Sequence, residues 1–290
     1  MAGILDLVGN TPLVELKKLN PNPRVKIYGK LEGHNPGGSV KDRAAKHMIS
    51  SALERGDIKR GDKLIEATSG NTGIALAMIS CLYGLEIELV MPANSTRERT
   101  LTMEAFGAKV TLLENIETCR DYAESKASSG THFQLNQFAN PDNYMAHYLH
   151  TGPEIFGDTA GTVTHFVSSM GTTGTIMGTS RFLKEQNPAI QIVGCQPTEE
   201  SSIPGIRRWP VEYLPKIYDP KRVDRIIDVS QQDATILARK LAKEEGIFSG
   251  MSSGGAAWAA IKLAAELESG VIVFIVCDRG DRYLSSDLFG

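Results

Sequence analysis

The chain has 290 residues, of which 41% are hydrophobic and 22% are charged, and its formal net charge is -3. The length favours two domains, and the small negative charge argues against nucleic acid or an anionic membrane as a partner. No apolar run is long enough to span a membrane, and the first residues lack the basic segment of a signal peptide. Four scattered cysteines without a CxxC motif fit a protein of the reducing cytoplasm.

Residues 35–45, NPGGSVKDRAA, predict a helix start that contains an unusual lysine. Ser39 is the expected N-cap and Asp42 completes a capping box, after which apolar residues recur at helical spacing. Lys41 would then lie in the first turn, near Arg43, at the positive end of the helix dipole. Either Lys41 points into water at a small cost, or its pKa is lowered and the free amine can attack a carbonyl to form a Schiff base.

Strand-like and helical runs alternate through most of the remaining sequence, which predicts an α/β protein with parallel sheets covered on both faces. Strands are expected at 63–67, 86–92, 108–113, 165–169, 190–197 and 271–278. Helices are expected at 73–83, about 96–106, about 175–186, 233–245 and 254–268. Residues 140–155, with their Pro and Gly content, are interpreted as a crossing between two halves. Residues 201–224 form a long irregular insertion, and such segments are more often functional than not.

Three turns between a strand and a helix have the composition of an anion site. TSGNTG (68–73) offers free N–H groups at a helix N-terminus to a carboxylate or phosphate, although an ordinary turn would look the same. GTTGT (171–175) adds three Thr hydroxyls and matches neither a Walker A loop nor GxGxxG, so a phosphate monoester fits it best. In GMSSGG (250–255), Ser252 or Ser253 is expected to cap the next helix, and the glycines allow a close approach.

These features together suit pyridoxal 5′-phosphate bound to an amino acid. The cofactor has an aldehyde for Lys41, a single phosphate, and a pyridine nitrogen that needs a partner. A metal ion is not expected. His147 and His150 lie close together in HYLH, but no Glu stands between them and no further ligand pattern is near, so a structural or surface role is favoured.

Several longer motifs resemble the fold-type II pyridoxal-phosphate enzymes. They are NTPLVEL, KLEGHNPGGSVKDRAA, IEATSGNTGIALA, LVMP, QFANPDN, SSMGTTGT and GMSSGG. The sequence is most similar to the cysteine synthases, also called O-acetylserine sulfhydrylases, and the segments SSIPGIRRWP and CDRGDRYLS narrow the resemblance to the B type. It runs from Asn10 to the last residue.

The resemblance implies a tryptophan synthase β-like fold with two domains, each built on a twisted, mostly parallel sheet. A small mobile domain, 36–147, would carry the substrate-carboxylate loop. A large domain, 1–35 and 148–290, would carry the phosphate loop, with pyridoxal phosphate in the cleft between the domains. A cytoplasmic homodimer is implied as well, with no nucleic-acid or membrane partner.

The resemblance also implies a role for each matched position. Lys41 would hold the cofactor as an internal aldimine and, once displaced by the amino acid, act as general base. Asn71 would bind the ring hydroxyl oxygen and Ser252 the pyridine nitrogen. Gly171, Thr172, Thr173, Gly174 and Thr175 would cradle the phosphate. Thr68, Ser69, Gly70, Thr72 and Gln137 would bind the substrate carboxylate.

The implied reaction is replacement of the acetate of O-acetyl-L-serine, through an aminoacrylate intermediate, by a sulfur nucleophile. Arg207 and Arg208 could meet that nucleophile, since a guanidinium binds oxyanions well, and thiosulfate would then be accepted beside sulfide to give S-sulfocysteine. Cys277 and Asp278 are expected to line the same pocket. The alternative is that the arginines are solvated or paired with Glu199, Glu200 or Asp281.

Three other identities are weighed against this one. Threonine and serine dehydratases share the fold, but DRAA after Lys41 and the Arg207–Trp209 insertion are not theirs. Cystathionine β-synthase is disfavoured because no residues remain for regulatory domains. A catalytically idle binding homologue is disfavoured by the intact lysine and cofactor loops.

Overall fold

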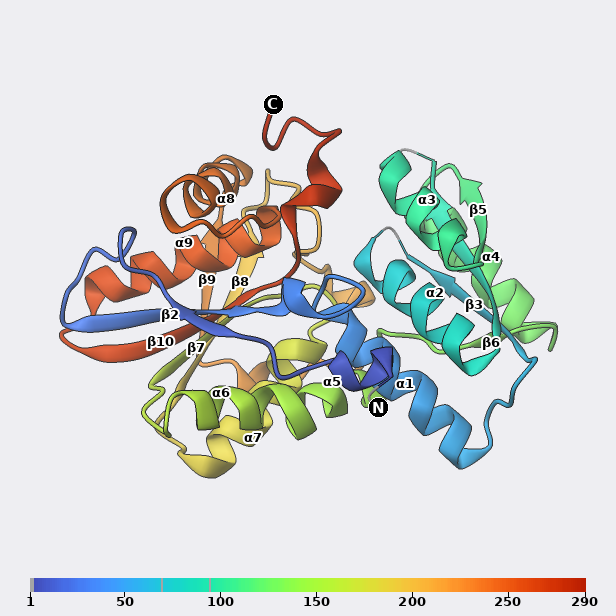
Figure 1. Cartoon of the computed structure of the whole chain (residues 1–290), viewed down its shortest axis with the longest axis horizontal. Coiled ribbons are helices and arrows are strands. Elements are labelled where there is room, and N and C mark those ends of the chain that lie inside the picture. The colour runs from blue at the N-terminus through green and yellow to red at the C-terminus, as the bar shows by residue number, and fades with distance from the viewer. Residues whose placement is uncertain (1–2, 69, 94) are drawn as a thin grey trace.

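The computed structural model describes residues 3–68, 70–93 and 95–290. Its backbone forms two sheets, and Figure 1 shows them as two lobes with their helices packed around them. The smaller sheet has four parallel strands in the order β5-β4-β3-β6. Its elements are β3 (Lys63–Ala67), α2 (Asn71–Tyr83), β4 (Glu86–Pro92), α3 (Arg97–Ala105), β5 (Lys109–Leu113), α4 (Ile116–Ser128) and β6 (Phe133–Gln134).

The larger sheet has six strands in the order β1-β2-β10-β7-β8-β9, and all its neighbours are parallel except β1 and β2. Its strands are β1 (Leu13–Glu15), β2 (Val25–Leu31), β7 (His165–Ser169), β8 (Gln191–Pro197), β9 (Arg225–Val229) and β10 (Gly270–Val276). Helices α6 (Gly152–Asp158) and α7 (Gly174–Gln186) cover one face, and α8 (Gln231–Glu245) and α9 (Met251–Glu266) lie over the other (Figure 1). The apolar core lies on both faces of this sheet, as the buried parallel strands predict.

Two segments join the lobes. Helix α1 (Lys41–Arg55) starts beside the large sheet and places Ala45, Met48 and Ile49 in the same apolar core as α2. The predicted crossing at 140–155 is helical rather than irregular: it consists of α5 (Pro141–Ala146), a π-helical stretch (His147–Thr151) and α6. Pro141 is the first residue of α5, where the N–H that proline lacks is not needed by the helix, and Pro153 follows the π-helical stretch. The domain bounds, 36–147 for the small domain and 1–35 with 148–290 for the large one, stay a prediction.

The predicted α/β class is confirmed, and the expected strands and helices occur within a few residues of their predicted limits. The sequence analysis did not identify β1, β2, α4, β9 or the short elements β6, α5 and α6. Short 3-10 turns occur at Ile4–Leu7, Glu32–His34, Val211–Tyr213, Pro220–Arg222 and Gly280–Tyr283. Within the described residues, no helix is long and apolar enough to cross a membrane.

Candidate active site

Lys41 is the first residue of α1, but the predicted capping box is wrong. The N-cap is Val40, and Asp42 accepts a hydrogen bond from the backbone N–H of Gly37 rather than from Ser39. The helix start is instead tied to the end of β10: the N–H of Val40 donates to the carbonyl of Cys277 over 2.8 Å. The backbones of Ser39 and Asp278 form an isolated antiparallel β-bridge. The position of Lys41 is therefore set by a strand more than two hundred residues away in the chain.

Burial lowers the pKa of the Lys41 ammonium, while Cys277, Asp278 and Glu32 act in the opposite direction. The sequence reasoning attributed a lowered pKa to neighbouring positive charge and the helix dipole; desolvation is the cause instead. Burial also raises the pKa of the Cys277 thiol to about 11, so that this neighbour stays protonated at neutral pH. Burial thus acts in favour of the neutral amine at Lys41, which is the form that can attack a carbonyl.

The carboxylate of Asp278 joins both lobes beside Lys41. It is buried and accepts hydrogen bonds from the Asn71 amide, the Tyr283 hydroxyl and the Gly250 N–H. The Asn71 carbonyl oxygen in turn accepts a hydrogen bond of 2.6 Å from Arg282. Asn71 begins α2, so these bonds hold the start of a small-lobe helix against the segment after β10. Sequence reasoning placed Asp278 in the pocket but not in this role.

Ser252 and Ser253 differ in their contacts. The Ser253 hydroxyl accepts a hydrogen bond of 2.9 Å from the Cys277 N–H. The Ser252 hydroxyl lies beside Cys277 and opposes the rise in the pKa of its thiol. The sequence analysis expected one of these serines to cap α9, but the N-cap is Gly250. Ser253 is thus tied to the backbone, whereas Ser252 shares with Lys41 the neighbour Cys277.

The start of α2 is coupled to a loop of the small lobe. The Thr72 hydroxyl donates a hydrogen bond of 2.8 Å to the side-chain oxygen of Gln137, and both residues are buried. Thr68 is the first residue after β3, and its hydroxyl accepts a hydrogen bond from the N–H of Gly70, the N-cap of α2. Ser69 lies outside the described residues. The structure therefore brings Thr72 and Gln137 together, as a shared carboxylate site requires.

The loop before α7 fits a phosphate group. Thr173 has a φ of 71°, in the left-handed region, and precedes the N-terminal turn of the helix. Its hydroxyl oxygen is buried without a hydrogen-bond partner among the described residues. A phosphate oxygen would supply that partner, and the helix N-terminus would stabilise the charge. At Gly174 a Cβ atom would collide with the side chain of Asn143, so only glycine fits there.

The sequence analysis missed Asn143 and considered His147 only as a metal ligand or a structural or surface residue, although both contact this loop. The Asn143 amide donates to the carbonyl of Gln137 over 2.7 Å and to the Thr172 hydroxyl over 3.1 Å, so it connects the two predicted anion loops. The buried His147 lies between the hydroxyls of Thr151 and Thr175. Burial lowers its pKa well below the ordinary value, so it stays neutral beside the loop. The structural role favoured for this histidine agrees with these contacts.

Arg207 and Arg208 point to different partners. Arg208 forms an ion pair of 2.7 Å with Asp228 and donates to the Pro197 carbonyl, so it fastens the insertion to β8 and β9. Arg207 is exposed and contacts the carbonyls of Ile203 and Ile206. The backbone N–H of Arg207 donates to the Met170 carbonyl, and the indole of Trp209 donates to the Gly171 carbonyl. These two bonds hold the insertion against the phosphate loop. Both arginines line a hollow of about 260 Å³ with residues of 197–206.

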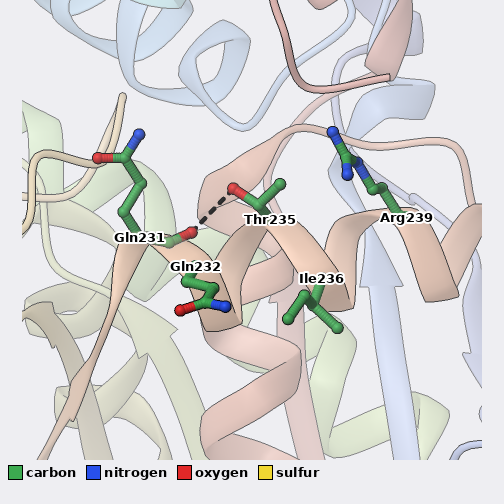
Figure 2. Close-up of a pocket in the computed structure, with 5 residues that line it drawn as sticks. All are labelled: Gln231, Gln232, Thr235, Ile236 and Arg239. Atoms are coloured by element: carbon green, nitrogen blue, oxygen red, sulfur yellow. Dashed lines mark hydrogen bonds between the residues drawn. The ribbon is translucent and has the colours of Figure 1, made fainter. Parts of the chain in front are cut away.

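Another hollow, of about 470 Å³, lies away from these residues on the outer face of α8 (Figure 2). The Thr235 hydroxyl there binds the Gln231 carbonyl within the helix. The residues that line this hollow all belong to α8, so it offers little enclosure for a specific ligand. Among the described residues, no group of three or more His, Cys, Asp or Glu side chains could hold a metal ion.

Comparison with known proteins identifies the family. The model of the pyridoxal-phosphate dependent enzymes matches residues 4–278. The chain belongs to this family. It is 60% identical to the cysteine synthase B of Pseudomonas aeruginosa, over 99% of this chain and 97% of that protein. The expected resemblance to fold-type II enzymes and to the cysteine synthases is thereby confirmed.

Solved structures agree with this assignment. A cysteine synthase from Entamoeba histolytica superposes with a TM-score of 0.93 at 39% identity, covering 100% of this chain and 90% of that one. An O-ureido-L-serine synthase superposes with a TM-score of 0.94 at 34% identity, covering 100% and 95%. Solved enzymes that are named for different products thus share this fold.

Proposed function

We propose that this chain is a cysteine synthase of the B type, which replaces the acetate of O-acetyl-L-serine by sulfide or thiosulfate. One observation carries the proposal. The amine of Lys41 lies beside Cys277 and Asp278, and these two residues also contact the proposed ring partners Ser252 and Asn71. High identity to a cysteine synthase B over nearly the whole chain supports the choice of substrate.

The residues that would hold pyridoxal phosphate are Lys41, Asn71, Ser252 and the loop Gly171–Thr175. When bound, the cofactor withdraws electrons from the amino acid so that its β-substituent can leave. Lys41, whose pKa is lowered by burial, then serves as the base for the Cα proton. Ser252 is neutral and stabilises a protonated ring less than a carboxylate would, which suits β-elimination over reactions with a long-lived carbanion.

The loop at 68–72, with Gln137, would bind the substrate carboxylate. Thr72 and Gln137 already share a hydrogen bond, and the small lobe reaches the C-terminal segment through Ser285 and Glu98 over 2.8 Å. Arg99 also lies 5.4 Å from the centre of the Tyr283 ring. A movement of the small lobe toward this segment would close the loop over the substrate and exclude water from the reacting carbon.

We assign the second substrate to Arg207 rather than to Arg208. Within the described residues no carboxylate lies within 4.0 Å of Arg207, whereas Arg208 is paired with Asp228. Arg207 is set against the phosphate loop by its backbone and by Trp209. Its guanidinium can bind the oxygen atoms of thiosulfate, while sulfide offers it only a small anion.

The proposal is tested by assaying the purified protein with O-acetyl-L-serine and either sulfide or thiosulfate in parallel. We expect L-cysteine from the first donor and S-sulfocysteine from the second, with acetate released in both. Absence of both products, together with turnover of L-serine or L-threonine to a keto acid, would favour a dehydratase instead.

We further propose a cytoplasmic homodimer with a small domain of residues 36–147. The resemblance supports the dimer, and the four cysteines, all unpaired, suit a reducing compartment. Sedimentation of the purified protein at about micromolar concentration should give the mass of two chains, since dimers are the commonest closed assemblies. A single-chain mass would contradict the dimer.

A further inference from the structure

Glu66 is a buried acid to which the reaction proposed above gives no role. It is the last but one residue of β3, and 2% of its surface is exposed. The loop that begins at Thr68 follows this strand. Within the described residues no lysine, arginine or histidine lies within ion-pair distance of it, and the facing charge is that of Arg120 on α4. A carboxylate without a close counter-charge is costly in such a place, so its contacts need a reason.

Those contacts are two successive backbone N–H groups. One oxygen of Glu66 accepts a hydrogen bond of 3.0 Å from the N–H of Asn136, and the other accepts a weaker one of 3.4 Å from the N–H of Gln137. Asn136 has a φ of 55°, in the left-handed region, which turns both N–H groups toward the same oxygen pair. Consecutive N–H groups of this kind form an anion-binding nest. Here the anion is a side chain of the chain itself.

The turn held in this way presents Gln137. Its side-chain oxygen accepts the hydrogen bond from Thr72, and its carbonyl accepts the one from Asn143. Glu66 thus stands on the strand that leads into the 68–72 loop and also fixes the turn that faces this loop. The side chain of Glu66 is therefore connected to both parts of the proposed carboxylate site, the 68–72 loop and the turn with Gln137.

We infer that Glu66 is a positioning residue for the substrate carboxylate, which holds the Asn136–Gln137 turn so that Gln137 meets Thr72. The inference rests on the proposed function, because it needs Gln137 and Thr72 to bind that carboxylate. An amide in place of the acid could accept only one of the two N–H groups, and its own NH₂ would face the other. Burial raises the pKa of Glu66 to about 7, and the two N–H groups and Arg120 act against that rise.

The test compares Glu66→Gln with Glu88→Gln in the loaded enzyme. Glu88 is the control, since it is also buried and lies next to Ile65 in the same sheet, but it binds Thr111 and Lys109 rather than the turn. For Glu66→Gln we expect KM for O-acetyl-L-serine to rise about tenfold, while kcat/KM for sulfide changes less than about twofold. Amide hydrogen exchange in the peptide 134–140 should become faster, and the affinity for pyridoxal phosphate should stay the same. The control should show none of these changes.

A second measurement asks whether Glu66 acts through Gln137. If it does, adding Glu66→Gln to Gln137→Ala should raise KM no further than Gln137→Ala alone. Additive effects on KM would overturn the inference. An unchanged KM for O-acetyl-L-serine in Glu66→Gln would also overturn it, as would an equal fall of kcat/KM for O-acetyl-L-serine and for sulfide. Glu66→Asp, which keeps the charge but is shorter, should also raise KM and replaces Glu66→Gln if that variant does not fold. An unchanged KM in Gln137→Ala would instead remove the proposed carboxylate site, and the role of Glu66 with it.

Discussion

The side-chain amide of Asn71 donates a hydrogen bond of 2.7 Å to the carboxylate of Asp278, although the two residues are 207 positions apart in the chain. The first residue of α2 is thereby held against the segment that follows β10. The same carboxylate accepts from Tyr283 and Gly250, so one buried group organises the small lobe, the C-terminal segment and the start of α9.

Replacing Asp278 by alanine should therefore destabilise the protein strongly. Three donors would lose their acceptor in a buried place, and we expect a loss of about 3 kcal/mol in the free energy of unfolding. Urea denaturation followed by circular dichroism measures it. Asp281→Ala is the control, because Asp281 is half exposed and forms, within the described part of the chain, only a long ion pair of 3.5 Å with Arg279. Similar midpoints for the two variants would show that Asp278 is not the organising group.

Ser252→Ala should still bind pyridoxal phosphate but turn over more slowly, because the ring nitrogen loses its partner. Ser253→Ala should mainly lower stability, by about 1 kcal/mol, since its hydroxyl serves the Cys277 backbone. Cofactor absorbance, kcat and the unfolding midpoint of each variant separate the two effects. If Ser253→Ala alone slows turnover, the ring partner has been assigned to the wrong serine.

Arg207→Ala should depress kcat/KM for thiosulfate at least about tenfold more than for sulfide, a difference of about 1.4 kcal/mol. Arg208→Ala should affect both donors alike, since Arg208 is engaged by Asp228 and acts on the insertion as a whole. Initial rates with each donor at saturating O-acetyl-L-serine provide the comparison. Equal losses with both donors in Arg207→Ala would mean that this arginine serves structure or closure.

Asp42 should make stability depend on pH. Burial raises its pKa to about 7, against the Gly37 N–H and the charges of Arg282 and Arg279, while Glu32 adds to the rise. The folded protein then keeps a proton that the unfolded chain loses near pH 4, so this group's contribution to stability is full below about pH 4 and falls as the pH rises to about 7. Asp42→Asn cannot titrate and can still accept from Gly37.

The free energy of unfolding of the wild type, minus that of Asp42→Asn, should therefore decrease by a few kcal/mol between about pH 4 and about pH 8. Urea denaturation of both proteins at the two pH values gives this difference. The same value at both would show that Asp42 ionises in the folded state as it does in the unfolded chain.

Local patterns in the sequence predicted much of this structure. Strong strand–helix alternation located β3, β4, β7, β8 and β10, and the glycine- and threonine-rich turns marked both anion loops. Helix α4, whose buried residues are Cys119 and Ala123, and the five-residue β9 offered too few apolar positions to be recognised. The predicted capping box failed because Asp42 has a nearer donor in Gly37, and because the end of β10 fixes the preceding residues.

The site contacts that the sequence analysis missed share another cause. Asn143 reaches Thr172, Glu66 reaches Asn136, and Asp278 reaches Asn71, so each acts on a residue distant in the chain. Single-sequence patterns report neighbours along the chain, and these contacts exist only once the sheets have formed. For Glu66 a signal was present, since a lone acid inside the apolar strand KLIEA is unusual.

The central claim is that Lys41 carries the cofactor, and its most direct test is chemical. The loaded enzyme is reduced with borohydride, digested, and the peptides are analysed by mass spectrometry. We expect the reduced pyridoxyl group on Lys41, and in Lys41→Ala we expect neither the visible absorbance nor the labelled peptide. Label on another lysine of the wild type, or undiminished visible absorbance in Lys41→Ala, would contradict the account.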